Sequence, residues 1–246
     1  MSYLSHKNVL VTGAGSGLGA AVTRAAAAAG ANVWGLDINT QAESEITNSG
    51  AKFVHCDVTS ENSWQSIAEQ VSSTTGHIDH LHLNAGIQAA PPEAPLEDYE
   101  FGNMNVQRYR QMMGVNVDGV VLGLHYLLPL MKPGGSIVVT GSLAGIVAYD
   151  VDPLYSMSKH AVTGLVRSLA KEMAALDLTI NALCPGGIDT NIIPNAQRVE
   201  QAIFMTPDHV ANEVLMLFET EENGKTWAKV AQQKPAYIYE STRKRD

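Results

Sequence analysis

Cysteine is scarce in this sequence: Cys56 and Cys184 are the two thiols among 246 residues. Two thiols cannot form the set of disulfides that stabilises small secreted proteins, and they cannot supply a zinc site of four thiolates. A composition of this kind suits a reducing compartment, so we expect a cytoplasmic protein.

Positive charge is also scarce. The chain has 16 Lys and Arg residues against 25 Asp and Glu residues, which gives a net charge of −9. Proteins that bind nucleic acids need clustered basic side chains to contact the phosphates. The one dense basic group, Arg243, Lys244 and Arg245, lies at the C-terminal end, where we interpret it as a solvated tail. We therefore expect no nucleic-acid partner.

Long hydrophobic runs are missing as well. No uninterrupted run reaches the roughly 18 apolar residues that a membrane-spanning helix needs. The stretch Val120–Met131 is broken by Gly123 and Pro129. The first residues, Met1–Asn8, are polar, and the apolar run Val9–Val11 is too short for a signal peptide. We expect neither a membrane anchor nor a membrane partner.

Enough hydrophobic residues are nevertheless present for a large core. They make up 45% of the chain, whereas charged residues make up 17%, a balance that argues against disorder. Short β-branched runs alternate with helical patterns along the whole chain. Strands are predicted at residues 8–12, 32–37, 52–57, 78–83, 135–140, 178–183 and 237–239. Helices are predicted at residues 18–29, 41–47, from 60 onward, 106–131, 155–175 and 207–219, with a loop over 89–105.

This alternation predicts right-handed βαβ crossovers and hence an α/β fold. We expect a single-domain Rossmann fold, in which helices flank a doubly wound, mostly parallel sheet of about seven strands. Ligands of such folds bind beyond the carboxyl ends of the strands. The residues that follow each strand are therefore the candidates for function.

The first strand runs directly into a glycine-rich loop and then into a helix. Glycine allows a pyrophosphate to approach the backbone, and the helix N-terminus supplies free N–H groups. A P-loop is excluded because no Gly-Lys-Ser/Thr sequence follows. A simple tight turn is the alternative interpretation. The expected cofactor-binding residues of this loop are Gly13, Ser16, Gly17, Leu18 and Gly19.

Acidic residues end the second and third strands. Asp37 follows Gly13 by 24 residues, the spacing of the carboxylate that binds the ribose diol of a dinucleotide. Its charge would repel a 2′-phosphate, so it favours NAD over NADP. A surface aspartate at a strand end is the alternative. Asp57, followed by Val58, could bind the adenine, and a helix cap around Thr59 is an equally good interpretation of Asp57.

Four motifs in order resemble those of the classical short-chain dehydrogenase/reductase family, over residues from about 8 to 190. The matching residues are Thr12, Gly13, Gly17 and Gly19; Asn84, Ala85 and Gly86; Ser142, Tyr155 and Lys159; and Pro185 and Gly186. In addition, Asn116 matches the family's helix asparagine. Leu83 departs from the usual second asparagine, and the usual glycine-rich C-terminal strand motif is absent. The tail, including Pro235-Ala-Tyr-Ile-Tyr, is more similar to the NAD-linked hydroxyprostaglandin dehydrogenase branch.

Tyr155 and Lys159 are separated by four positions, so they share one helix face. A free tyrosine has a pKa of about 10, and an adjacent ammonium together with a nicotinamide cation favours the phenolate. A shift of about 3 units requires about 4 kcal/mol. We expect Tyr155 to remove the alcohol proton as hydride leaves carbon for the nicotinamide, with Ser142 holding the oxygen. Considered one at a time, Tyr155 would be interpreted as an aromatic residue at the start of an amphipathic helix, and Lys159 as a solvated lysine.

The resemblance implies further roles. It places Lys159 on the nicotinamide ribose, and it gives Asn116 a water that links Lys159 to solvent. A buried amide satisfied by the backbone is the alternative for Asn116. The resemblance also adds Asn84, Ala85, Gly86, Tyr155, Lys159, Pro185, Gly186, Ile188 and Thr190 to the cofactor-binding residues.

We expect one domain over residues 1–246, with a dinucleotide-binding half at 8–86 and a catalytic half at 106–190. Residues 191–206 are predicted to form a mobile flap with an apolar inner face over the substrate. A surface loop packed on the core is an equal alternative. Asp152 either faces the substrate or caps the helix that follows, and capping is the commoner role.

The predicted function is an NAD-dependent oxidoreductase that interconverts a secondary alcohol and a ketone. The alternatives are an NADH-linked ketoreductase that works mainly in reverse, and a non-catalytic NAD-binding sensor. No metal is expected, because the cluster His77, His80 and His82 lacks accompanying carboxylates. The resemblance implies a homodimer or homotetramer that associates through the helices carrying Asn116 and Tyr155.

Overall fold

The computed structural model describes residues 2–200 and 202–240, so the basic group Arg243, Lys244 and Arg245 lies outside the described residues. The strands are β1 (Asn8–Thr12), β2 (Asn32–Asp37), β3 (Lys52–His55), β4 (Ile78–Leu83), β5 (Met131–Thr140), β6 (Thr179–Pro185), β7 (Thr226–Lys229) and β8 (Tyr237–Ile238). The helices are α1 (Gly17–Ala28), α2 (Glu43–Asn48), α3 (Glu61–Thr74), α4 (Val106–Met113), α5 (Gly119–Leu127), α6 (Pro153–Ala175) and α7 (Pro207–Glu219).

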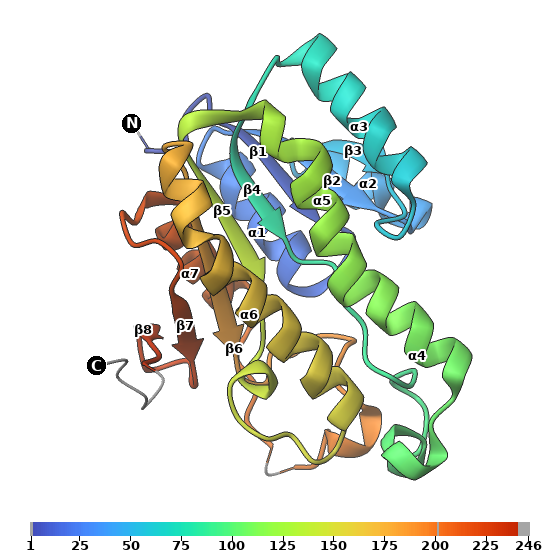
Figure 1. Ribbon diagram of the computed structural model, residues 1–246. Coiled ribbons are helices and arrows are strands. Elements are labelled where there is room, and N and C mark those ends of the chain that lie inside the picture. The colour runs from blue at the N-terminus through green and yellow to red at the C-terminus, as the bar shows by residue number, and fades with distance from the viewer. Residues whose placement is uncertain (1, 201, 241–246) are drawn as a thin grey trace.

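All of these strands belong to one sheet in the order β3-β2-β1-β4-β5-β6-β7-β8. Every neighbouring pair is parallel except β7 and β8. Helices cover both faces (Figure 1): α3, α5 and α6 lie in front of the sheet, and α1, α2 and α7 lie behind it. The strand order reverses direction between β1 and β4, which is the position where such folds bind ligands. The predicted single-domain, mostly parallel α/β fold is confirmed.

Two hydrophobic cores hold these layers together, one on each face of the sheet. The front core includes Trp64 and Val166, and the rear core includes Val22 and Phe218. Helix α1 consists largely of small side chains and makes its closest packing with α7 and the sheet. Each fully buried aliphatic or aromatic side chain contributes roughly 1.5–3 kcal/mol. The strands are rigid supports for the loops that follow them.

The helix expected over residues 106–131 has the predicted extent but is not regular. It consists of α4, a π-helical segment at Gly114–Asp118, α5, and a 3₁₀ turn at Leu128–Leu130. A π-helical segment widens the helix by one residue per turn and is frequent at functional sites. Asn116 lies in this segment, and its side chain leaves the helix to bond with the backbone of Ile87.

The sheet has one strand more than the seven that we predicted. The additional strand, β7, is four residues long and carries a lysine at its end, so its sequence gives a weak strand signal. It forms because β6 offers an unpaired edge for parallel pairing. The buried Lys229 amine lies 2.5 Å from the Glu213 carboxylate on α7 and also donates to the Lys234 carbonyl.

Three smaller expectations also change. The helix predicted over 41–47 is a 3₁₀ turn at Thr40–Ala42 followed by α2, and the loop over 89–105 contains 3₁₀ turns at Leu96–Tyr99 and Phe101–Asn103. The predicted strand at 237–239 is β8. These are differences of boundary and local pitch, which short-range patterns resolve poorly.

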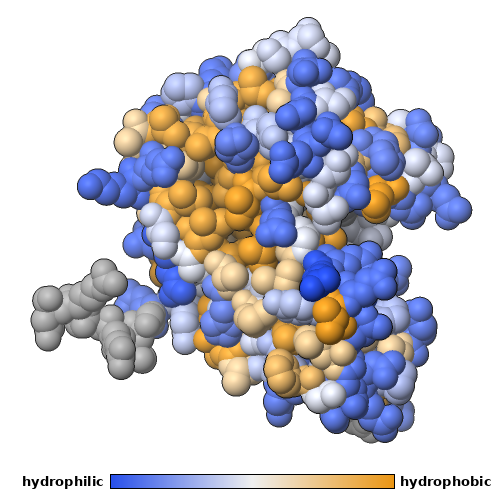
Figure 2. Space-filling model, turned by 45° about the vertical axis from the view of Figure 1, so that its right-hand side comes forward, coloured by the Kyte–Doolittle hydropathy of each residue, from blue (hydrophilic) through white to orange (hydrophobic). Residues whose placement is uncertain are grey.

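Among the described residues, one helix is long and apolar enough to cross a membrane by length and composition alone. It spans Val106–Leu130, with a mean hydropathy of 1.3 over its most apolar window, one third of which is buried. The search for uninterrupted apolar runs does not select this helix, because Gly123 and Pro129 break its apolar stretch. A single such helix is weak evidence for a membrane, because core helices of folded domains meet the same test. Figure 2 shows that hydrophobic side chains also gather in the upper middle of one molecular face.

Candidate active site

A cavity of about 740 Å³ opens at the carboxyl ends of the strands. It is large enough for a dinucleotide and a small substrate together. Of the predicted site residues, Gly19 and Asn116 are the two that do not line it. All the other predicted site residues line the cavity: Gly13, Ser16, Gly17, Leu18, Asp37, Asp57, Val58, Asn84, Ala85, Gly86, Ser142, Tyr155, Lys159, Pro185, Gly186, Ile188 and Thr190.

The glycine loop turns sharply between β1 and α1. Gly13 and Gly17 have φ angles of +66° and +52°, a region that side chains with a Cβ rarely adopt. Gly19 serves packing, because a Cβ there would lie 2.0 Å from the Gly13 carbonyl oxygen. Ser16 precedes α1 without a side-chain capping bond, and no acidic residue lies in the first turn. The first N–H groups of α1 therefore remain available, which fits a pyrophosphate.

Asp37 is held firmly beside this loop. One carboxylate oxygen accepts the Gly15 N–H at 2.7 Å, and the other accepts the Asn39 N–H at 2.8 Å. Each oxygen keeps a lone pair that can accept a further hydrogen bond. The residues at this end of the cavity thus fit the ribose diol of a dinucleotide.

Asp57 has the capping role that was the alternative interpretation. Its Oδ1 accepts both the backbone N–H and the hydroxyl of Thr59, at 2.9 Å and 2.7 Å. It also lines the cavity, next to Val58. Capping and adenine binding are compatible, because the second carboxylate oxygen has no hydrogen-bond partner among the described residues.

A chain of buried hydrogen bonds supports the glycine loop from β4 and β5. His82 Nε2 lies 2.9 Å from the Thr140 hydroxyl, which donates to Asn84 Oδ1 at 3.1 Å. The Asn84 amide then donates to the Thr12 carbonyl. Because the single hydroxyl proton of Thr140 goes to Asn84, His82 must donate from Nε2. Neither the histidine cluster, at which no metal is expected, nor the motifs had indicated this role for His82.

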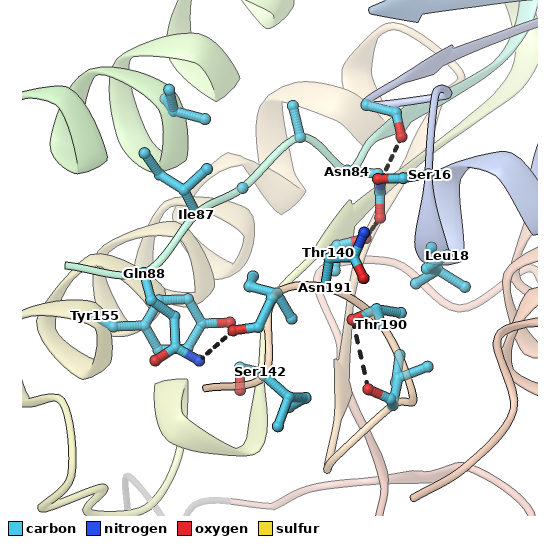
Figure 3. Close-up of a pocket in the computed structure, with 18 of the residues that line it drawn as sticks. Ser16, Leu18, Asn84, Ile87, Gln88, Thr140, Ser142, Tyr155, Thr190 and Asn191 are labelled. Carbon is cyan, nitrogen blue, oxygen red and sulfur yellow. Dashed lines mark hydrogen bonds between the residues drawn. The ribbon is translucent and has the colours of Figure 1, made fainter. Parts of the chain in front are cut away.

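Tyr155, Ser142 and Lys159 come from α6 and from the end of β5. Figure 3 shows Tyr155 and Ser142 at one end of the cavity, together with Gln88, whereas Ser16, Leu18 and Asn84 lie at the other end. The Lys159 amine lies 5.6 Å from the centre of the Tyr155 ring and donates to the Thr140 carbonyl at 2.9 Å. A phenol, a hydroxyl and an amine therefore share one wall.

Burial is the main influence on the pKa values of Tyr155 and Lys159. It raises the pKa of the Tyr155 phenol above its usual value, and the hydrogen bond with Ser142 opposes that rise. Burial lowers the pKa of Lys159 to about 8. The rise at Tyr155 is opposite to the direction that a general base needs near neutrality. Lowering the phenol pKa therefore requires a further positive charge beside Tyr155.

Asn116 is 1% exposed, and its side chain is well satisfied. Its Oδ1 accepts the Ile87 N–H at 2.9 Å, while its Nδ2 donates to the Ile87 carbonyl and to the Ser158 hydroxyl. This arrangement matches the alternative of a buried amide bonded to backbone. Lys159 remains near: a Cβ on Gly86 would meet the Lys159 amine at 3.3 Å and the Asn116 oxygen at 3.4 Å.

Asp152 is fully buried and caps α6. Its two oxygens accept the N–H groups of Tyr155 and Ala89, each at 2.9 Å. Burial raises the pKa of its carboxyl. The capping interpretation therefore describes its contacts, and it ties the loop after β4 to the first turn of the helix that carries Tyr155.

Five residues of the segment predicted as a flap line the cavity: Asn191, Ile192, Ile193, Gln197 and Phe204. Gln88 donates to the Ile192 carbonyl at 3.0 Å, and Tyr149 exchanges hydrogen bonds with Gln197. At its end, Met205 forms a bridge with Ile188, beside Thr190, whose hydroxyl is 3.4 Å from the Ile188 carbonyl.

Sequence reasoning missed several residues that line this cavity. Thr140 ends a strand, and Gln88 follows Gly86 by two positions, so both positions carried a signal. Tyr149 and Arg108 lie in loop and helix segments with no recognisable motif. Their position depends on tertiary packing.

Comparison with known proteins agrees with this geometry. The short chain dehydrogenase family matches residues 7–201. The 2,5-dichloro-2,5-cyclohexadiene-1,4-diol dehydrogenase of Sphingobium indicum is 37% identical over 202 residues, or 80% of this chain and 78% of that protein. The mitochondrial borneol dehydrogenase of Lavandula x intermedia is 32% identical, over 89% of this chain and 85% of that protein.

Solved structures agree as well. Levodione reductase superposes with a TM-score of 0.80 at 26% identity, covering 92% of this chain and 96% of that one. A blue fluorescent protein from a metagenomic library, in complex with NADPH, superposes with a TM-score of 0.79 at 26% identity and the same coverage.

The doubly wound sheet and the cavity at its carboxyl edge define a nucleotide-binding oxidoreductase. The chain belongs to the short-chain dehydrogenase/reductase family, as its motifs had indicated. Its class of reaction is oxidoreduction at the CH–OH group of a small alcohol or ketone, with a nicotinamide dinucleotide. Membership of the hydroxyprostaglandin dehydrogenase branch stays a prediction.

Proposed function

We propose that this protein is an NAD-dependent dehydrogenase that interconverts a cyclic secondary alcohol and its ketone. The observation that carries the proposal is one cavity with Ser142, Tyr155 and Lys159 on the wall at one end and Asp37 at the other. Relatives named for cyclic alcohols support the substrate class. They include the two dehydrogenases above and the trans-4-hydroxycyclohexanecarboxylate dehydrogenase of Sinomonas cyclohexanicum, 29% identical over 93% of this chain and 92% of that protein.

The catalytic roles follow from the wall. Tyr155 accepts the alcohol proton in oxidation and returns it in reduction, and Ser142 holds the substrate oxygen by hydrogen bond. Lys159 binds the cofactor ribose and lowers the phenol pKa, while Asn116 fixes the backbone beside Lys159 through Ile87. The nicotinamide, when bound, accepts or supplies the hydride and adds the positive charge that Tyr155 needs.

The cofactor would lie along the remaining predicted residues. The N–H groups after Ser16 would bind the pyrophosphate, and Asp37 would accept hydrogen bonds from the adenosine ribose. A 2′-phosphate there would face a carboxylate, with no basic residue in the glycine loop to compensate, so NAD is favoured over NADP. Ile188 and Thr190 would bind the carboxamide.

The proposal has three further parts. Residues 191–206 would act as the flap over the substrate. The protein would be a cytoplasmic homodimer or homotetramer, associated through α4, α5 and α6, whose exposed apolar side chains include Val106, Val121 and Met157.

The decisive experiment compares the wild type with Tyr155→Phe. We expect the wild type to produce NADH from NAD and a cyclic secondary alcohol, and the variant to lose at least 100-fold in kcat. NADH binding, followed by fluorescence, should change by less than about threefold. Turnover retained in Tyr155→Phe would refute the proposed base. NADH binding without turnover of any alcohol or ketone by the wild type would instead favour the sensor.

A further inference from the structure

The cavity that is lined by Tyr155 and Ser142 contains one positive charge that the proposed reaction does not use. Arg108, in the first turn of α4, lines the same cavity as Tyr155 and Ser142. It forms no ion pair with any carboxylate in residues 2–200 and 202–240. By contrast, Arg24 pairs with two carboxylates and Arg198 with one.

The Arg108 guanidinium is fixed at one corner only. Its Nη1 donates to Gln111 Oε1 at 3.0 Å, and its backbone N–H is held by Asn105. Its Nε is shielded from solvent and has no hydrogen-bond partner among the described atoms. Its Nη2 group also has no hydrogen-bond acceptor among the described residues, so the guanidinium keeps donors for a carboxylate.

The buried carboxylate of Asp152 forms no ion pair with Arg108. Asp152 uses its two oxygens for the N–H groups of Tyr155 and Ala89. Around the cavity, Ala90, Val115 and Phe204 add apolar surface. The cavity therefore offers a phenol and a hydroxyl for the reacting carbon, apolar side chains, and one guanidinium without an ion pair.

We propose that Arg108 is the anchor for an anionic group on the substrate, so that the substrate is a hydroxy acid with an apolar ring between its carbinol and its carboxylate. This inference rests on the proposed dehydrogenase function. The net charge of −9 gives no general attraction for anions, so recognition depends on this local contact. A hydrogen-bonded charge pair contributes roughly 1.5–3 kcal/mol, which corresponds to about 10- to 150-fold in kcat/KM.

The test uses a matched pair of alcohols, 4-hydroxycyclohexanecarboxylate and its neutral carboxamide. We expect the wild type to prefer the carboxylate by at least 10-fold in kcat/KM, mainly through KM. Arg108→Gln should bring that ratio close to one. Arg110→Gln is the control, because Arg110 is an exposed arginine on the same helix and does not line the cavity. Equal use of the two alcohols by the wild type, or an unchanged ratio in Arg108→Gln, would overturn the inference.

A binding measurement separates this inference from the proposed function. Cyclohexanecarboxylate, which has no carbinol, is titrated calorimetrically into the NADH-saturated protein. Its Kd should rise at least 10-fold in Arg108→Gln and stay unchanged in Arg110→Gln. If that contrast appears while no alcohol is oxidised, Arg108 is the anion site and the proposed reaction is wrong. If the carboxamide is oxidised but cyclohexanecarboxylate binds equally to all three proteins, the reaction stands and Arg108 is not the anchor.

Discussion

The hydrogen-bond chain that runs from His82 through Thr140 to Asn84 should respond differently to two substitutions. We expect removal of the Thr140 hydroxyl to reduce stability much more than replacement of His82. Thr140→Val keeps the shape of the side chain and removes its hydroxyl. The Nε2–H of His82 is then left without an acceptor, and Asn84 Oδ1 loses the donor that it has at 3.1 Å. A change of tautomer gives no relief, because His82 Nδ1 also has no partner among the described residues. At 1–3 kcal/mol for each of these two orphaned groups, we expect a loss of about 2–6 kcal/mol.

His82→Leu acts on the same chain with a much smaller expected cost. The change removes one hydrogen bond, worth about 1 kcal/mol net, but it also removes the orphaned Nδ1. Thr140 still donates to Asn84, and it lines the cavity, where water can reach it. We expect His82→Leu to change stability by 1 kcal/mol or less, and the double variant to recover at least half of the loss caused by Thr140→Val.

Urea unfolding at pH 7.5 measures these three free energies. A loss in His82→Leu as large as that in Thr140→Val, or simple additivity in the double variant, would refute the assigned direction of the chain. The ¹⁵N shifts of His82 provide an independent check, because the Nε2–H tautomer is expected at neutral pH.

Three further predictions follow from charges and their surroundings. Burial lowers the pKa of His80 to about 4 and that of His82 to about 3, whereas the unfolded chain takes up these protons below about pH 6.5. The contribution of these two histidines to the free energy of unfolding should therefore be fully present above that pH. The free energy of unfolding should fall by up to about 2.7 kcal/mol per pH unit between pH 6 and pH 4.5. Urea unfolding at several pH values should show that His82→Leu removes half of this slope. Asp37→Ser should weaken NADH binding by about 10- to 100-fold and change the cofactor preference from NADH to NADPH. Fluorescence titration with both cofactors measures this preference. An unchanged preference would show that Asp37 does not bind the adenosine ribose. Glu213→Leu should lower the free energy of unfolding by about 3–5 kcal/mol, because it leaves the Lys229 amine, which is 1% exposed, without its carboxylate partner. In thermal unfolding, the double variant Glu213→Leu/Lys229→Met should recover most of that loss.

Residues close together in sequence predicted the first half of the fold well. Strand β1 was predicted from the run Asn8–Thr12, the start of α1 from the glycine loop, and the end of β2 from Asp37. Each of these features depends on local pattern and on glycine geometry. The site was predicted to the extent that its residues stand in motifs, such as Tyr155 and Lys159 one helical turn apart.

Features that depend on distant partners were not predictable in this way. β7 exists because β6 offers an edge, and the π-helical segment contains Asn116, which bonds to a loop 29 residues away. The unpaired state of Arg108 can be recognised only once its neighbours are known. Burial raises the pKa of Tyr155, a tertiary effect that spacing alone does not reveal.

The position of β7 has a consequence for truncated forms of the protein. The Gly186 N–H donates to the Lys229 carbonyl at 2.9 Å, and the Lys229 amine donates in turn to the Lys234 carbonyl. The wall of the cavity after β6 is therefore braced by one of the last described segments of the chain. A polypeptide that ends before residue 229 lacks this brace. A dinucleotide bound against Gly186 would accordingly stabilise molecules that contain β7 in preference to molecules truncated before it.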